Sequence, residues 1–229
     1  MLFFLDKPAV LLGLLLAFVI GVYLGSAAQA LTARALGDPM PMRAGWLKPS
    51  LKRQVSVFSA IAVLLAGWGW AEPVPMNDRW RARRFHVVTA VLTRPLVYAL
   101  LCLAALGGVR ATDVGVGTSL GTARLIDTTG GFGPDLLFAM ATGFAALCVT
   151  ALIPCPPTDL GRVIFTLGGQ TMGWQRARYQ LEERNFGVGI VLGLLLLPVL
   201  LSGFPSWVGQ LAPQLIRGLS AILGVPVLT

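Results

Sequence analysis

Four long apolar runs constrain the fold of this 229-residue chain most strongly, over residues 8–36, 85–108, 132–153 and 186–201. A helix crosses the hydrocarbon core of a bilayer with about 20 predominantly apolar residues, so each run predicts a transmembrane helix. Hydrophobic residues make up 55% of the chain and charged residues only 12%, against about 25% charged residues in soluble domains. A soluble domain of this length has too small an interior for so much apolar surface. We therefore predict an all-α, polytopic membrane protein.

Two further segments are ambiguous. Residues 55–70 are apolar but marginal in length, and basic residues flank them on both sides. These flanking residues are Arg34, Arg43, Lys48, Lys52 and Arg53 before the segment, and Arg79, Arg81, Arg83 and Arg84 after it. Basic residues gather on the cytoplasmic side, so we expect a re-entrant or surface-lying segment here. Residues 204–229 carry one charge, Arg217, and fit either an interfacial helix or another crossing.

The charge distribution gives an orientation. With residues 34–84 and 170–185 on the cytoplasmic side, the N-terminus lies outside, and the formal net charge of +8 belongs to cytoplasmic loops. The excess of basic residues therefore needs no nucleic-acid partner. Fifteen Arg against three Lys, with abundant Ala and Gly, suggest a GC-rich bacterial genome. We expect a single integral membrane domain over residues 1–229 in the bacterial cytoplasmic (inner) membrane.

Four short stretches carry a family resemblance. Residues 25–41 read G-S-A-A-Q-A-L-T-A-R-A-L-G-D-P-M-P, residues 69–77 G-W-A-E-P-V-P-M-N, residues 93–98 T-R-P-L-V-Y, and residues 151–162 A-L-I-P-C-P-P-T-D-L-G-R. In this order they resemble motifs of the site-2 proteases, the intramembrane zinc metalloproteases, in their compact bacterial branch. Those motifs read H-E-x-x-H-A followed by A-x-x-x-G-D-x-T-P, then G-W-A-K-P-V-P-x-N, A-G-P-x-x-N and N-x-x-P-x-P-P-L-D-G-x-R. The resemblance implies a site-2-protease-like helical core over about residues 8–169, followed by C-terminal helices over 186–229.

The catalytic positions of the resemblance are degenerate. An active member holds zinc with two histidines one helical turn apart and a distal aspartate, and uses the intervening glutamate as general base. Gly25 and Gln29 stand at the histidine positions and Ser26 at the glutamate position, so only Asp159 is kept. A neutral hydroxyl does not accept a proton from water as a carboxylate does. We therefore expect no catalytic residue, no metal and no cofactor.

Three other positions depart from the motifs. Tyr98 and Ala151 replace asparagines, and Arg94 replaces a glycine beside the helix-breaking proline. A charge inside a membrane-spanning segment costs about 2.5–3.5 kcal/mol on insertion scales and normally has a partner. We predict an intramembrane ion pair between Arg94 and Asp159 in the place of the zinc. In the alternative, Arg94 extends to the cytoplasmic surface while Asp159 caps a short helix.

These features predict a pseudoprotease. A site-2-protease-like fold without its chemistry could bind transmembrane segments of a larger membrane complex without cutting them, as a scaffold, assembly factor or accessory subunit in the lipid bilayer. One alternative is an active intramembrane zinc metalloprotease with unorthodox ligation, for which Cys148 and Cys155 are the nearest extra donors. The single histidine, His86, lies outside the matched motifs. A transporter or channel component would need more polar residues in its spans.

Overall fold

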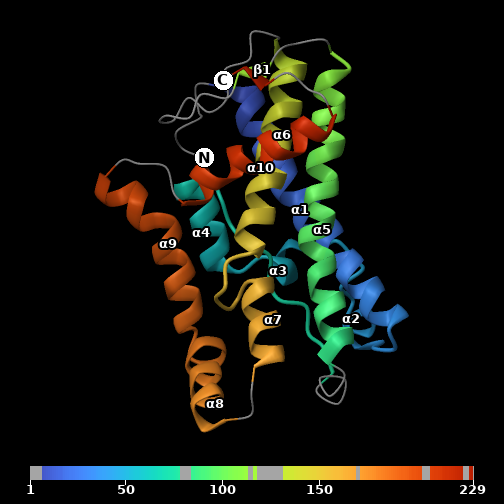
Figure 1. The fold of residues 1–229 in the computed structure, drawn as a ribbon, viewed down its shortest axis with the longest axis vertical. Helices are drawn as coiled ribbons and strands as arrows, with labels where there is room; N and C mark the ends of the chain where they lie inside the picture. Colours follow the sequence, from blue (N-terminus) through green and yellow to red (C-terminus); the bar gives the residue numbers. More distant parts are fainter. Residues whose placement is uncertain are drawn as a thin grey trace.

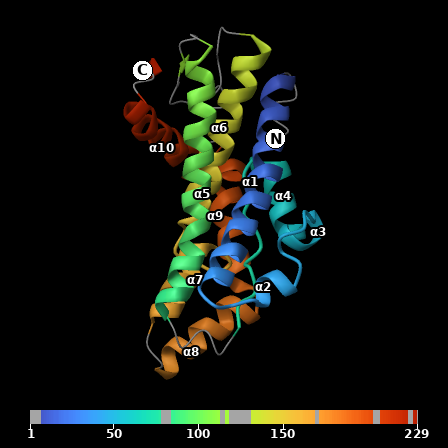
Figure 2. The same cartoon turned by 90° about the vertical axis from the view of Figure 1, so that its right-hand side faces the viewer.

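The computed structural model describes residues 7–77, 84–112, 116–117, 131–168, 171–202, 207–223 and 227–228. Three long helices form the centre of the fold: α1 (Pro8–Ala35), α5 (Arg84–Arg110) and α6 (Phe132–Ala151). Each is long and apolar enough to cross a membrane, and the three pack side by side along the long axis of the molecule (Figures 1 and 2). They coincide with three of the four expected spans.

Small residues let α1 and α6 approach closely. A Cβ added to Gly143 would lie 2.5 Å from the Cβ of Ala17, and one added to Gly13 would lie 2.7 Å from the Cβ of Ala139. Larger side chains at these positions would push the two helices apart. In lipid, where water drives no association between apolar helices, such close van der Waals packing is a main source of helix–helix attraction.

The fourth expected span forms a shorter helix. Helix α9 (Phe186–Ser202) has 17 residues and packs beside α4 (Val57–Ala66) at one side of the bundle. Among the described residues, only α1, α5 and α6 meet the length and hydropathy expected of a span.

The apolar tail does not run parallel to the bundle. Helix α10 (Trp207–Leu223) lies across α6 (Figures 1 and 2). It buries Val208, Ala212 and Ile216 in the core that α6 shares. This crosswise direction is not that of another membrane crossing alongside α1, α5 and α6.

The ambiguous segment between α1 and α5 turns back on itself. Two short helices, α2 (Met40–Arg43) and α3 (Leu51–Gln54), precede α4. Ser56 caps the start of α4, where its Oγ accepts a hydrogen bond from the Ser59 N–H, and Gly67 caps the end in a left-handed conformation, φ 84°. At about 1.5 Å per residue, its ten residues are too short to cross a bilayer. Residues 68–77, which we call the extended segment, then return toward the end of the molecule where α5 begins. Arg79, Arg81 and Arg83 lie outside the described residues.

A proline-rich loop, residues 152–158, leads from α6 into α7 (Asp159–Leu167). Helix α8 (Met172–Arg178) and the π-helical turn η3 (Tyr179–Glu183) connect α7 to α9. Two-residue strands, β1 (Val116–Gly117) and β2 (Val227–Leu228), pair in parallel. The loop, α7 and the extended segment meet beside the middle of α5, where the candidate site lies.

Candidate functional site

Arg94 and Asp159 form a buried salt bridge. Arg94 lies in α5 and Asp159 is the first residue of α7, and Arg94 Nη1 donates to Asp159 Oδ1 at 3.0 Å. The side chains are 1% and 2% exposed. Arg94 therefore does not extend to the surface, and the alternative interpretation of this residue is wrong. The structure brings together the two charges that the sequence paired.

The other terminal nitrogen of Arg94 joins two more segments. Arg94 Nη2 donates to the backbone carbonyl of Glu72 at 3.0 Å and makes a longer contact, 3.4 Å, with Ser26 Oγ. One guanidinium therefore connects α5, α7, α1 and the extended segment. Sequence reasoning missed the Glu72 carbonyl, because a backbone acceptor has no signature in residue type.

Arg94 and Tyr98 occupy the space beside Gly25. A Cβ on Gly25 would lie 2.7 Å from Tyr98 Cε1 and 2.9 Å from Arg94 Cγ. A histidine at residue 25 thus has no room while these two side chains keep their positions. The remaining void, which Tyr98, Ala151 and Asp159 help to line, measures about 10 Å³, roughly the space of one water molecule.

Gln29, one helical turn after Gly25 and Ser26, has unsatisfied hydrogen-bonding groups among the described residues. Its side chain is fully buried, and neither its amide nitrogen nor its amide oxygen has a partner among the described residues. The hydroxyl of Tyr98 is also buried without a partner there. Each unsatisfied buried polar group costs about 1–3 kcal/mol. The region therefore keeps polar groups that its own side chains do not satisfy.

The proline-rich loop fixes the position of Asp159. Thr158 Oγ1 donates to the carbonyls of Ile153 and Cys155, and a Cβ on Gly161 would lie 2.4 Å from the carbonyl carbon of Cys155. Helix α7 therefore starts tightly packed against the loop. Burial raises the pKa of the Asp159 carboxyl, and the positive charges of Arg94 and Arg162 oppose this rise.

Asp38 is a second buried carboxylate, which the sequence reasoning did not single out. Its Oδ1 accepts from the Met40 N–H at 3.0 Å and its Oδ2 from the Asn77 N–H at 2.9 Å. It therefore holds the end of the extended segment against the chain that follows α1. The sequence signal for this carboxylate was its position directly after Gly37, in the turn that follows α1; Gly37 has a positive φ of 102°.

The described residues around Asp159 do not fit a zinc ion. Within the described part of the chain, no group of three or more His, Cys, Asp or Glu side chains could hold a metal. Gly25, Ser26 and Gln29 supply no strong zinc ligand from α1, and His86 lies in the first turn of α5. The one carboxylate at the expected place, Asp159, already binds a guanidinium.

Comparison with known proteins gives one relative. The chain is 26% identical over 191 residues, 78% of each chain, to a protein of Bacillus subtilis (strain 168) named "Putative zinc metalloprotease YwhC". No family model matches the chain, and no solved structure matches it. The similarity agrees with a metalloprotease-like helical core and concerns most of the length of both proteins.

Proposed function

We propose that this chain is a catalytically inactive, site-2-protease-like membrane protein that binds transmembrane segments of a larger membrane complex. It would act as a scaffold, assembly factor or accessory subunit. We place it in the bacterial cytoplasmic membrane with its N-terminus outside, because nine of its 18 basic residues lie between residues 34 and 84, on either side of α4, and basic loops stay in the cytoplasm.

The observation that carries the proposal is the guanidinium of Arg94 on the carboxylate of Asp159. In the resembling family this aspartate ligates zinc; here a side-chain cation binds it at 3.0 Å. Arg94 and Tyr98 also fill the space that a ligand at residue 25 would need. Without a carboxylate at Ser26 there is no general base to activate water.

The binding role rests on the resemblance. It implies a helical core that receives transmembrane segments. A chain that keeps this core without the chemistry would hold such a segment and leave it intact. A partner within the membrane also suits a chain with so few charged residues.

Metal content and proteolysis test the inactive state. We expect the purified full-length chain to contain far less than one zinc per molecule and to leave transmembrane reporter substrates uncut. The triple variant Gly25→His, Ser26→Glu, Gln29→His should also stay inactive, because Arg94, Tyr98 and Ala151 are unchanged. Stoichiometric zinc together with cleavage by the unmodified chain would instead establish the alternative, an active metalloprotease with unorthodox ligation.

The accessory role has a separate test. Native mass spectrometry of the chain, extracted from its own membrane in mild detergent, should show a complex of fixed stoichiometry with another membrane protein. A chain that is monomeric in every mild detergent and lacks associated protein would contradict the accessory role, whatever its catalytic state.

A further inference from the structure

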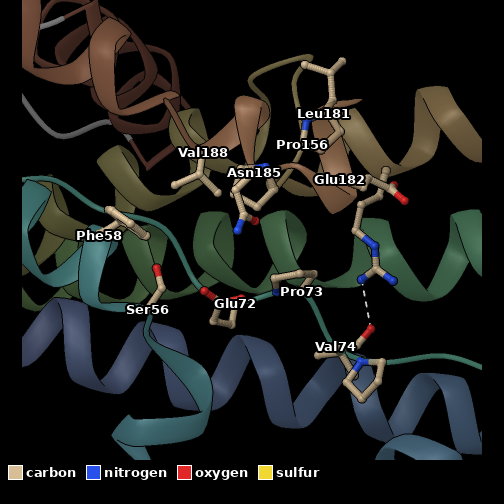
Figure 3. Close-up of a pocket in the computed structure, with 13 residues that line it drawn as sticks. Ser56, Phe58, Glu72, Pro73, Val74, Pro156, Leu181, Glu182, Asn185 and Val188 are labelled. Atoms are coloured by element: carbon tan, nitrogen blue, oxygen red, sulfur yellow. Dashed lines mark hydrogen bonds between the residues drawn. The ribbon is translucent and has the colours of Figure 1, made fainter. Parts of the chain in front are cut away.

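A second site lies beside the extended segment, at Glu72, whose backbone carbonyl accepts from Arg94. It is a cavity of about 480 Å³, within the size range of small-molecule sites. Residues 72–75 form one wall, and the proline-rich loop and the start of α9 form the other. Figure 3 shows Glu72 and Val74 across this space from Asn185 and Val188.

Glu72 gives the cavity an unpaired negative charge. Its backbone is held at both ends, since its N–H donates to the Gln54 carbonyl at 2.8 Å and its own carbonyl accepts from Arg94. Its carboxylate has no hydrogen bond or ion pair with any residue that the structure describes. The backbone contacts therefore hold the residue that carries this carboxylate at the wall of the cavity.

Arg162 supplies a positive charge in the same cavity, and this charge also interacts electrostatically with Asp159 and Glu182. Its Nη1 donates to the Val74 carbonyl at 2.9 Å; no other hydrogen bond or salt bridge of this guanidinium occurs within the described ranges. The other carboxylate in the lining, Glu182, is already paired with Arg178 at 2.9 Å. The cavity thus offers the unpaired carboxylate of Glu72 and, in Arg162, a guanidinium that keeps N–H donors without an acceptor among the described residues.

Apolar surface adjoins these charges. Phe58 lines the cavity and is 48% exposed, while Ile61 on α4 and Phe186 and Ile190 on α9 are also exposed. Both α4 and α9 are apolar helices, shorter than the three candidate spans. A polar cavity beside an exposed apolar surface matches an amphiphile, with its head in the cavity and its chains along α4 and α9.

We propose that this cavity binds the headgroup of an aminophospholipid such as phosphatidylethanolamine. The ammonium donates to the Glu72 carboxylate and the phosphate accepts from the Arg162 guanidinium, as charge-assisted hydrogen bonds. Phosphatidylcholine has no N–H to donate, and phosphatidylglycerol has no positive charge for Glu72. This inference is independent of whether the chain is a protease.

Lipid titration of the full-length chain in detergent, followed by native mass spectrometry, tests the headgroup preference. We expect a single tight site that binds phosphatidylethanolamine about tenfold more strongly than phosphatidylglycerol or phosphatidylcholine, the weight of one charge-assisted bond. Glu72→Gln should reduce this preference to about twofold or less. Glu72→Lys should invert this preference in favour of phosphatidylglycerol, a gain that misfolding would not produce.

A matched control adds a positive charge away from the cavity. Gln214→Lys, on the exposed side of α10, should keep the original preference for phosphatidylethanolamine.

Three results would overturn the proposal. Equal binding of all three lipids would indicate adventitious lipid only. A preference for phosphatidylethanolamine that survives Glu72→Lys would place the lipid elsewhere. A polypeptide that crosslinks into the cavity in place of lipid would assign the site to a protein partner.

Discussion

The side chain of Arg94 connects parts of the chain that are distant in sequence, much as a bound metal cation connects its ligands. Its partners Ser26, Glu72 and Asp159 lie 68, 22 and 65 residues away. A buried ion pair is not strongly stabilising in itself, but losing one partner leaves an uncompensated charge. The contribution of Arg94 to stability can therefore be measured only by comparing variants that remove Arg94, Asp159 or both.

A double-mutant cycle measures this coupling. Arg94→Met and Asp159→Leu should each lower the free energy of unfolding by about 3–5 kcal/mol, because each strands the opposite charge. The double variant should lose less than either single variant. Denaturant unfolding in detergent micelles measures the free energy of unfolding of the three variants and shows which loses most. Additive losses would show that the two charges are independent.

Gly25 offers a test of the filled space beside Arg94. Gly25→Ala should destabilise the chain by about 1–3 kcal/mol, since the new methyl group has to displace Tyr98 or Arg94 in a tightly packed interior. Gly107, in α5, has nothing within 4 Å of an added Cβ. Gly107→Ala should be neutral or stabilising by up to about 1 kcal/mol. Thermal unfolding of the two variants, measured together, tests this difference. Equal changes in their unfolding temperatures would contradict the close contact at Gly25.

At the level of elements, the start of α9 packs against the proline-rich loop with no space to spare. A Cβ on Gly187 would lie 2.0 Å from the Pro156 carbonyl oxygen. Cys155 Sγ lies 3.9 Å from the Gly187 carbonyl. The loop that leads to Asp159 is thus supported from the side of α9 as well as from α7.

Alkylation of Cys155 reports on this packing. Burial raises the pKa of the Cys155 thiol, so little thiolate exists at neutral pH and alkylation is slow. Gly187→Ala should push the start of α9 away, lower this pKa and speed alkylation, by about tenfold for each pKa unit recovered. Gly189→Ala, in the same helix with nothing within 4 Å of its Cβ, should leave the rate unchanged. Peptide mass spectrometry separates Cys155 from the buried Cys102 and Cys148.

The elements differ in how far the sequence predicts them. The apolar runs at 8–36, 85–108 and 132–153 correspond closely to α1, α5 and α6, because a bilayer sets both length and composition. The direction of α10 could not be predicted, since hydropathy measures apolar length and says nothing of the angle at which a helix packs. Likewise, the pairing of Arg94 with Asp159 could be predicted from their charges. The contact of Arg94 with the Glu72 carbonyl could not, because it depends on the path of the backbone.

For the whole molecule, the arrangement of helices determines which loops share a side of the membrane. The end of α1 and the start of α5 lie at the same end of the bundle (Figure 1), although α4 lies between them in sequence. The basic residues around α2 therefore lie toward the same end as Arg84, whereas α3 lies nearer the middle of the molecule (Figures 1 and 2).

Cysteine labelling with a membrane-impermeant maleimide tests that topology. Lys52→Cys and Arg84→Cys, at exposed positions, should be labelled from one side of the membrane. Thr112→Cys, exposed just beyond α5, should be labelled from the opposite side. Intact cells and inverted vesicles together assign each side. Labelling of Lys52→Cys and Arg84→Cys from opposite sides would mean that the segment around α4 crosses the bilayer.

The salt bridge also has a consequence for biosynthesis. Asp159 is made 65 residues after Arg94, so α5 leaves the ribosome well before its counter-charge exists. During that interval only the neutral oxygens of Ser26 and Glu72, already synthesised, are available to the guanidinium. We expect α5 to settle at its final depth only once α6 and α7 have emerged, which makes insertion of this helix wait for the translation of a later one.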